Sequence, residues 1–496
     1  MIKKLIYLLF LLISLSIKSQ TNIFLKRNYW KSNPSIEDID LRIKEGYDIT
    51  ALNPNAFDPV VYALLEKVDN ETILYLLSKK GNGANKLTHD GRTYIFWSAY
   101  KANLDIMKHL VKIGAKTDLQ DDKGYSIFNF VASTGSQDKS IYNYLISLGS
   151  KPNIEKDRYG ANASLLIAPY VKDTSFIDYF TSLGINISTT DNEGNNMINY
   201  AARGGNKEII NYLIDKDLSY NIPNKNGGNA FIFASKGTKN HRNSLEFYQY
   251  LEELGINPNV INKDGINVLH YLSYRNKNKT IFNYFIDKGV SVNQADKHGN
   301  TPFINAASSN NLDVVSYLYK NVKNINFANK DGQSALSKSI QGNQPDVVNF
   351  LLENKADVNI IDKRGKNLSY YLITSFNSKK IDEFKNKIKL VEDYGFNIKE
   401  TQGNGDTLYH LAIDKNSIEL LQWIQSLNIN INAKNKDGYT ALHKAIMTAS
   451  DDKIIKFLIK YGADKTIKTD FGESVYDLAK ENELLQKNKI NIKFLK

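Results

Sequence analysis

The chain has 496 residues, of which 42% are hydrophobic and 24% are charged, and it contains only 9 prolines. This balance excludes an intrinsically disordered chain, because apolar material for a core is ample. The lack of cysteine excludes disulfide bonds, a lipoprotein anchor and a cysteine nucleophile, and the formal net charge of +11 is modest for this length, so no nucleic-acid partner is expected.

The first residues have the layout of a secretory signal peptide. Two lysines precede an apolar run over residues 5–15, and polar residues 16–20 follow. The run is too short to span a bilayer comfortably, and no later run of 18 or more apolar residues is present. We therefore predict a signal peptide over residues 1–19, no transmembrane segment after its removal, and a periplasmic or secreted location. An uncleaved anchor is the alternative.

Residues 20–54 form an N-terminal segment, in which residues 36–44 are predicted to be a single capping helix. Beyond it, a glycine returns about every 33 residues, at spacings between 33 and 40. The series is Gly91, Gly124, Gly160, Gly194, Gly227, Gly265, Gly299, Gly332, Gly365, Gly405, Gly438 and Gly472. A fixed period of this size indicates a stacked array of one supersecondary unit, which is typical of a binding surface.

The repeat over residues 296–326 shows what one unit contains. Turn-forming residues around Gly299 predict a hairpin tip. Thr301 and Pro302 predict the N-cap and the first position of a helix. Two adjacent alanines on that helix have small side chains, so neighbouring helices can approach it closely. After a polar break, apolar residues at helical spacing predict a second helix. They are Leu312, Val315, Leu318 and Tyr319.

This pattern resembles the ankyrin repeat, whose hallmark is a glycine, then Thr-Pro-Leu-His, paired small residues, and Gly-Ala-Asp and Asn before the next tip. Short sequences close to Thr-Pro-Leu-His begin at Asn267, Thr407 and Thr440. Gly462-Ala-Asp matches the last part of the hallmark. The resemblance covers nearly everything from residue 36 onward. It implies an all-α solenoid of about 13 helix-turn-helix repeats with hairpin tips, an array over residues 55–471 and a C-terminal capping repeat over residues 472–496.

Three spacings exceed the others, and the extra residues fall between the two helices of their repeats. They lie around residues 134–139, 237–243 and 375–385. We predict surface loops opposite the hairpin tips at all three places.

No constellation in the chain predicts catalysis. A glycine-rich phosphate loop, a zinc-type histidine pair and a GxSxG elbow are all absent from the sequence. His270, His410 and His443 occupy the family's structural histidine position, where the resemblance implies hydrogen bonds that steady the tip, whereas His89 and His298 are predicted to be solvated turn residues. We therefore predict that the protein is not an enzyme and has no cofactor or metal site.

The resemblance implies a concave surface of tips and inner helices that binds a protein partner. In seven repeats, the residue two positions before the tip glycine is basic. These residues are Arg158, Lys225, Lys263, Lys297, Lys330, Lys363 and Lys436. This row would suit an acidic partner, although Lys followed by Asp is also ordinary family usage. Six residues after the glycine, the inner helix carries aromatic rings in Tyr62, Trp97, Phe130, Tyr200, Phe233 and Tyr271.

Such rings are good anchors for a protein segment, could stack on sugar rings, or are simply framework. Next to the tip glycines, further aromatic or arginine side chains are candidate contacts. They are Arg92, Tyr125, Tyr159, Arg364 and Tyr439. The first hypothesis for function is an exported, non-catalytic protein-binding scaffold. The alternatives are a carbohydrate or cell-envelope binding module and a secreted effector that acts on another cell.

Overall fold

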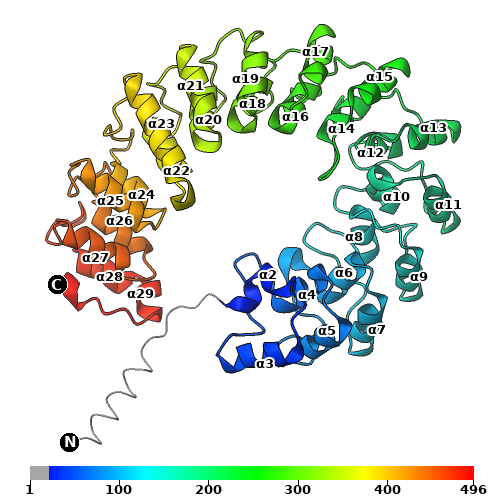
Figure 1. The fold of residues 1–496 in the computed structure, drawn as a ribbon, viewed down its shortest axis with the longest axis horizontal. Helices are drawn as coiled ribbons and strands as arrows, with labels where there is room; N and C mark the ends of the chain where they lie inside the picture. The colour runs from blue at the N-terminus through cyan, green and yellow to red at the C-terminus, as the bar shows by residue number, and fades with distance from the viewer. Residues whose placement is uncertain (1–21) are drawn as a thin grey trace, which may run out of the picture. The chain divides into compact units, whose positions relative to one another are not determined.

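The computed structural model describes residues 22–496, so the predicted signal peptide lies outside the described residues. The chain divides into two compact units. Unit 1 comprises the chain up to Lys225 together with residues 237–243, and unit 2 comprises residues 226–236 and 244–496. Both units are built from one element, a pair of helices that follows a hairpin tip (Figure 1).

Unit 1 contains an N-terminal helical cap and five helix pairs. The cap consists of η1 (Ile23–Leu25), α2 (Arg27–Trp30) and α3 (Ile36–Lys44). The inner helices are α4 (Pro59–Glu66), α6 (Tyr94–Tyr100), α8 (Ile127–Ser133), α10 (Ala163–Ile167, continued by η3, Ala168–Tyr170) and α12 (Met197–Ala202). The outer helices are α5 (Asn70–Leu77), α7 (Leu104–Lys112), α9 (Lys139–Ser147), α11 (Ser175–Ser182) and α13 (Lys207–Asp215). A short turn, η2 (His89–Gly91), forms one tip.

Unit 2 contains eight helix pairs. Its inner helices are α14 (Ala230–Lys236), α16 (Val268–Arg275), α18 (Pro302–Ser309), α20 (Ala335–Gly342), α22 (Leu368–Ser375), α24 (Leu408–Ile413), α26 (Ala441–Thr448) and α28 (Val475–Glu481). Its outer helices are α15 (Leu245–Glu253), α17 (Lys279–Asp287), α19 (Leu312–Tyr319), α21 (Pro345–Glu353), α23 (Ile381–Asp393, preceded by η4, Ser378–Lys380), α25 (Ile418–Ser426), α27 (Lys453–Lys460) and α29 (Glu483–Lys487). The segment η5 (Lys493–Leu495) follows.

The predicted all-α repeat architecture is confirmed. Over residues 22–496, α4 to α29 form 13 consecutive pairs, which equals the number of repeats expected from the sequence. The hairpin tips are too short to form strands, and the β-structure in the described residues is limited to isolated bridges from Gln120 to Ser126 and from Ala328 to Ser334.

The repeat with α18 shows why these residues adopt this unit. Thr301 caps the helix, because its hydroxyl accepts a hydrogen bond from the Ile304 N–H at 3.2 Å, and Pro302 occupies the first helical position. Ala306 and Ala307 are fully buried, and their small size lets α18 lie between α16 and α20 (Figure 1). An inner helix is therefore enclosed on two sides by its neighbours.

Outer helices bury one face only. In α19 the buried residues are Val314, Val315 and Leu318, so Val314 occupies a core position that the sequence pattern assigned to Leu312. Tyrosine hydroxyls link successive outer helices: Tyr284 donates to Glu252 at 2.8 Å. The same link recurs from Tyr179 to Asn143 and from Tyr317 to Asn283, each at 2.8 Å, and from Tyr75 to Asp40 and Tyr212 to Asp178.

The N-terminal cap is larger than the single helix that the sequence predicted. A helix does span residues 36–44, as α3, but η1 and α2 precede it and α2 packs against α4. Trp30 of α2 is fully buried, and its indole N–H donates to the carbonyl of Phe24 at 2.8 Å. Two large aromatic side chains therefore cover the apolar end of the array, which a lone amphipathic helix would leave exposed.

The tips have the backbone conformation that the returning glycine predicts. The twelve tip glycines have φ between 71° and 84°. The first repeat has Ala56 at this position, with φ of 56°. A residue with a side chain costs about 1–2 kcal/mol in this left-handed region, so the first tip is more strained than the others.

The three insertions are not simple surface loops. Residues 134–138 do connect α8 and α9, but Gln137 donates to the carbonyl of Tyr170 in the next repeat at 3.0 Å. In the second insertion Asn243 is buried, and its amide donates to the carbonyl of Ala202 at 2.8 Å. The third insertion lengthens an outer helix, because α23 begins at Ile381. Residues of the first two insertions thus bond to neighbouring repeats, and those of the third extend a helix.

Candidate functional site

Successive tips in unit 2 are joined by single backbone hydrogen bonds. From Gly265 to Gly438, the N–H two residues before each tip glycine donates to a carbonyl of the preceding tip, as from Lys330 to His298 and from Lys363 to Asp331, both at 2.9 Å. Each tip is also closed internally. In the tip before α18, one oxygen of the Asp296 carboxylate accepts from the N–H groups of His298 and Asn300, both at 2.8 Å. The tips are therefore held in register with one another.

Gly332 shows why a tip position admits no side chain. Its φ is 81°, and a Cβ built on it would lie 2.9 Å from the backbone nitrogen of Lys363 in the next tip. The glycine is therefore required by the backbone conformation and by the approach of the neighbouring tip.

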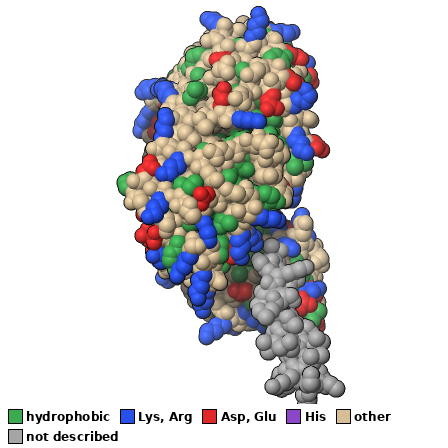
Figure 2. Space-filling model, turned by 90° about the vertical axis from the view of Figure 1, so that its left-hand side faces the viewer, with side chains coloured by type: hydrophobic (Ala, Val, Ile, Leu, Met, Phe, Trp, Pro, Cys, Tyr) green, Lys and Arg blue, Asp and Glu red, His purple; other side chains and the backbone are tan. Residues whose placement is uncertain are grey.

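The basic row two residues before the tip glycine keeps its side chains in solvent. Arg158, Lys225, Lys263, Lys297, Lys330, Lys363 and Lys436 are all exposed. On the face drawn in Figure 2, Lys and Arg side chains lie among polar, apolar and acidic ones.

Two of the four aromatic side chains in the row of unit 1, Trp97 and Phe130, are buried and form part of the core. Trp97 and Phe130 expose only 5% and 6% of their surface, and the Trp97 indole N–H donates to the Thr88 hydroxyl at 2.8 Å. Little of either ring is left for a partner to touch.

Tyr62 and Tyr200 are half-buried, and their hydroxyls are tied to the tips of their own repeats. Tyr62 accepts from the amide of Asn53 at 2.7 Å, and its ring is stacked with Phe57 at 5.6 Å between centroids. Tyr200 donates to Asp191 at 2.9 Å. Burial, followed by the charge of Asp191, raises the pKa of Tyr200 well above its usual value. These hydrogen bonds hold both side chains in one orientation.

Arg92, a predicted contact residue, lies inside the structure. It exposes 6% of its surface, its guanidinium is 2.7 Å from the Asp121 carboxylate and 3.1 Å from Asp90, and it lies over the Phe130 ring at 4.2 Å. Its position between a carboxylate and an aromatic ring makes it a link between two repeats rather than a surface anchor.

The other tip residues differ in exposure. Tyr159 is 61% exposed, and Arg364 is exposed with its guanidinium 3.2 Å from Asp362. Tyr439 is half-buried. Tyr125 is also half-buried, and burial, followed by the charges of the Asp157 and Asp121 carboxylates, raises its pKa to about 12. Only Tyr159 and Arg364 extend fully into solvent.

In unit 2 the aromatic row contains Phe233, which is 8% exposed, and Tyr271, which is half-buried. The ammonium of Lys236 lies 5.1 Å from the centroid of the first ring and 4.9 Å from that of the second. Such a cation over two rings is a favourable electrostatic contact and orders the lysine.

The three histidines have the structural role that the resemblance implied. In His410, Nδ1 accepts from the Thr407 N–H at 3.2 Å and Nε2 donates to the Tyr439 carbonyl of the next tip at 2.9 Å. His270 and His443 make the same pair of bonds, with Nε2 on the carbonyls of Asn300 and Ile467. Burial lowers the pKa of all three imidazoles. Each therefore joins two repeats as a neutral ring.

Acidification should consequently destabilise unit 2. The folded state holds these histidines with pKa values below the unfolded value of 6.5, so the unfolded chain binds more protons as the pH falls. The free energy of unfolding should decrease as the pH falls through 6.5 and level off below the folded pKa. Urea unfolding at pH 7.5 and pH 5.5 measures this, followed by the fluorescence of Trp423 in a background with Trp30→Phe and Trp97→Phe. His410→Gln should reduce the pH dependence, and equal stability at both pH values would contradict the expectation.

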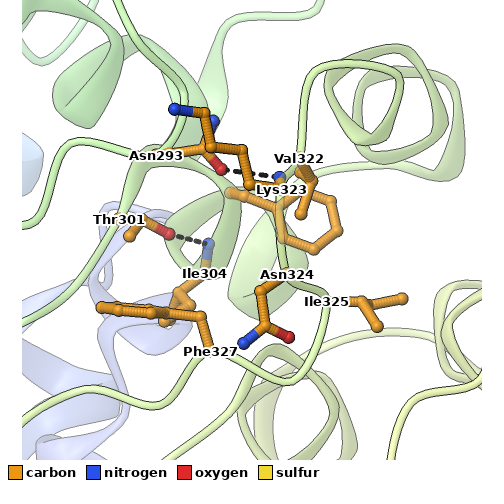
Figure 3. Close-up of a pocket in the computed structure, with 9 residues that line it drawn as sticks. Asn293, Thr301, Ile304, Val322, Lys323, Asn324, Ile325 and Phe327 are labelled. Atoms are coloured by element: carbon orange, nitrogen blue, oxygen red, sulfur yellow. Dashed lines mark hydrogen bonds between the residues drawn. The ribbon is translucent and has the colours of Figure 1, made fainter.

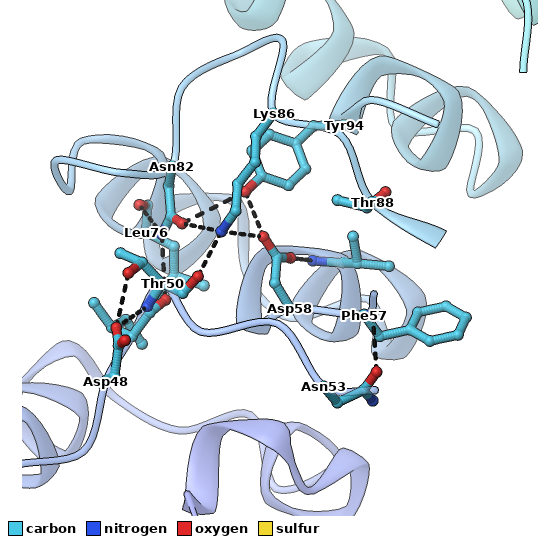
Figure 4. A network of polar contacts seen from close by, with 12 residues as sticks. Asp48, Thr50, Asn53, Phe57, Asp58, Leu76, Asn82, Lys86, Thr88 and Tyr94 are labelled. Carbon is cyan, nitrogen blue, oxygen red and sulfur yellow. Dashed lines mark hydrogen bonds and ion pairs between the residues drawn. The ribbon is translucent and has the colours of Figure 1, made fainter. Parts of the chain in front are cut away.

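Sequence reasoning missed a buried polar network in the first repeats (Figure 4). The Asp58 carboxylate is fully buried and contacts the Lys86 ammonium at 2.8 Å, the Tyr94 hydroxyl at 2.5 Å and the Val61 N–H at 2.9 Å. Burial, followed by the charge of Asp58, raises the pKa of Tyr94 far above its usual value. The available signal was an acid immediately before Pro59, where the hallmark has threonine.

A small cavity of about 290 Å³ lies in unit 2 (Figure 3). Phe303 and Ile304 of α18 line it together with the loop that leads to the next tip, which contributes Val322 and Phe327. Lys323 and polar side chains lie at its edge. The cavity offers no pair of titratable groups for acid-base chemistry.

Residues 22–496 contain no group of three or more His, Asp or Glu side chains that could hold a metal ion. In the same part of the chain, no helix combines the length and the apolar character needed to cross a membrane.

Comparison with known proteins decides the family. A model of ankyrin repeats matches residues 165–262, 240–328, 269–362 and 377–469, which together make up more than half of the chain. The chain belongs to the ankyrin-repeat family. The tips, the capped inner helices and the histidines that join them are therefore ankyrin-repeat features in this protein.

Several known proteins are similar to parts of the chain. Alpha-latrotoxin-Lg1a of Latrodectus geometricus is 29% identical over 20% of this chain and 7% of its own length. A protein named as an ankyrin-repeat protein in Borreliella burgdorferi is 35% identical over 20% of this chain and 22% of its own length. A protein named as an ankyrin-repeat protein in Acanthamoeba polyphaga mimivirus is 24% identical over 63% of this chain and 39% of its own length. The matches thus cover less than two fifths of each of these relatives.

Among solved structures, the ankyrin-repeat domain of human ASB11 is 18% identical, with a TM-score of 0.37. The match covers 45% of this chain and 96% of that domain.

Proposed function

We propose that this ankyrin-repeat protein is an exported, non-catalytic scaffold that binds a protein partner on the tips and inner helices of unit 1. Ankyrin repeats indicate a protein-interaction scaffold. The observation that carries the proposal is the fixed register of the tips. In unit 1 the N–H of Asn192 donates to the carbonyl of Tyr159 in the preceding tip at 2.8 Å, and that of Lys225 donates to Glu193 at 2.8 Å.

Rigid display lowers the cost of binding, because few backbone or side-chain degrees of freedom remain to be lost when a partner docks. The residues that we propose as contacts are those with accessible rings on this surface: Tyr62, Tyr159 and Tyr200. Tyrosine supplies a large amphipathic contact area and is enriched at binding hot spots. Trp97, Phe130 and Arg92 are buried and are left out of the proposed contacts.

Export is supported by the layout of residues 1–19, with two lysines before a short apolar run, and by the absence of cysteine. The proposal of a non-catalytic role is supported by the cavity in unit 2, whose lining residues include no pair of titratable groups for acid-base chemistry.

A capture experiment tests the proposal. The tagged chain, purified from the periplasmic fraction of its own host, should begin near Gln20 by mass and retain one stoichiometric protein. Tyr159→Ala combined with Tyr200→Ala should reduce retention at least about tenfold, since two hot-spot rings together contribute more than about 1.4 kcal/mol. Tyr394→Ala is the matched control, because this 43% exposed ring lies at the end of α23, away from the tips.

Unchanged retention by the double variant, with normal helical circular dichroism, would show that unit 1 does not make the contact. Retention on glycans with no protein partner would favour the carbohydrate-binding alternative. A chain that keeps Met1 in the cytosol would refute export.

A further inference from the structure

Four consecutive repeats of unit 2 carry an exposed lysine at the same tip position. They are Lys263, Lys297, Lys330 and Lys363, each two residues before its tip glycine. Their backbone N–H groups donate to the preceding tip at 2.8, 2.6, 2.9 and 2.9 Å. The main chain of each lysine is therefore fixed, and the four side chains leave the tips in one register. We call these four residues the tip lysine row.

Most of the row lacks a counter-ion. The ammonium of Lys297 lies 3.2 Å from the Asp264 carboxylate. Within residues 22–496, no carboxylate oxygen lies within 4.0 Å of the ammonium groups of Lys263, Lys330 or Lys363. Arg364 adds a further exposed guanidinium beside Lys363. Because these positive charges are held at regular intervals, they raise the local positive electrostatic potential. They therefore favour an anionic ligand that contacts each ammonium group.

The spacing of the row matches an extended polypeptide. Packed helices of adjacent repeats are about 8–10 Å apart, and an extended strand rises about 3.3 Å per residue. One lysine per repeat therefore corresponds to every third residue of an extended segment. The next repeat has Gly403 at this position and the last has Asp470, so the row ends after the fourth lysine.

The acidic residues between the lysines distinguish among anionic ligands. Asp264 and Asp331 directly follow Lys263 and Lys330 in their tips. A nucleic acid or other continuous polyanion would bring charge against these carboxylates as well as against the lysines. A peptide can place uncharged residues there and avoid the repulsion.

We propose that the tip lysine row binds an extended acidic segment of a protein partner, with a carboxylate at every third residue. This surface is separate from the tyrosines of unit 1. The proposal that this row binds an acidic segment rests on the proposed scaffold function, and it specifies the chemistry of a bound segment.

The test uses the full chain and a fluorescent peptide of about 15 residues with glutamate at every third position and serine and threonine between. Anisotropy at low ionic strength should show binding that weakens as salt is added, because exposed ion pairs are screened. The same peptide with glutamine for glutamate should bind at least about tenfold more weakly, as should a peptide with its glutamates clustered at one end.

The variant replaces all four lysines of the row by glutamine and should lose at least about tenfold in affinity for the glutamate peptide. The matched control changes the same charge at four exposed lysines of unit 2 outside the tips, as Lys277→Gln, Lys279→Gln, Lys320→Gln and Lys385→Gln. Its affinity should change less than about twofold. Circular dichroism and urea unfolding check that both variants are folded.

Equal loss by the two variants, or equal binding of the clustered peptide or of double-stranded DNA, would overturn the proposal in favour of general attraction to polyanions. The outcome is separable from that of the scaffold function. If the row variant binds the glutamate peptide as tightly as the unchanged protein while the partner is still captured, the acidic-segment proposal fails and the scaffold stands. If no partner is captured at all, the scaffold function fails whatever the peptide does.

Discussion

Replacing Asp58 by alanine should lower the free energy of unfolding of the first repeats by about 3–5 kcal/mol, the usual cost of removing one partner of a buried ion pair. The carboxylate is fully buried, and its loss leaves the Lys86 ammonium and the Tyr94 hydroxyl without their acceptor. The ammonium retains only the carbonyl of Thr50 at 2.7 Å and the Asn82 side chain at 3.1 Å.

Urea unfolding in a Trp423→Phe background measures this effect, because the remaining tryptophans lie close to the network. Trp30 belongs to the N-terminal cap, which packs against α4, and Trp97 belongs to α6, which also carries Tyr94. Asp105→Ala is the matched control, since Asp105 is an exposed acid in the first turn of α7 and contributes less than about 1 kcal/mol. Equal effects of the two substitutions would show that the buried network does not stabilise unit 1.

Gly332→Ala should cost about 2–3 kcal/mol in the centre of unit 2. About 1–2 kcal/mol comes from forcing alanine to a φ of 81°, and about 1 kcal/mol from the inter-tip hydrogen bond that the new Cβ disrupts. Hydrogen exchange measured by mass spectrometry should show faster exchange in α18 to α22, because a repeat is stabilised through its interfaces with its neighbours.

Gly255→Ala separates the two contributions. Gly255 has φ of 80°, and an added Cβ meets no atom within 4 Å. Its replacement should therefore cost only the backbone strain of about 1–2 kcal/mol. If Gly332→Ala costs no more than this control, the contact between successive tips does not contribute to stability.

The features predicted correctly from the sequence are those set within one repeat. Gly299 needs a left-handed backbone, and Thr301 with Pro302 suits a helix start, so local residue chemistry is sufficient to locate both. The period aligns the repeats, and the resemblance to the ankyrin repeat then implies the structural role of His410. The tip and the helix start require only the conformational preferences of short segments and their recurrence.

Side-chain contacts between residues of adjacent repeats could not be predicted from the preferences of single segments. Arg92 and Asp121 are 29 residues apart, and Asp58 and Tyr94 are 36 apart, so nothing in either segment alone shows that they meet. For the same reason Arg92 was predicted as a surface contact although it is buried between neighbours. Partner binding by Tyr62, Tyr159 and Tyr200 remains a prediction from position and exposure.

The sequence by itself determined the period, the tip conformation and the helix caps, because these depend on the backbone preferences of glycine, proline and threonine over a few residues. Only the tertiary structure decided which side chains of each repeat are available to a partner. Stacking buries Trp97 and Arg92 and leaves the tip lysine row in solvent, and that outcome depends on contacts between repeats rather than on residue type.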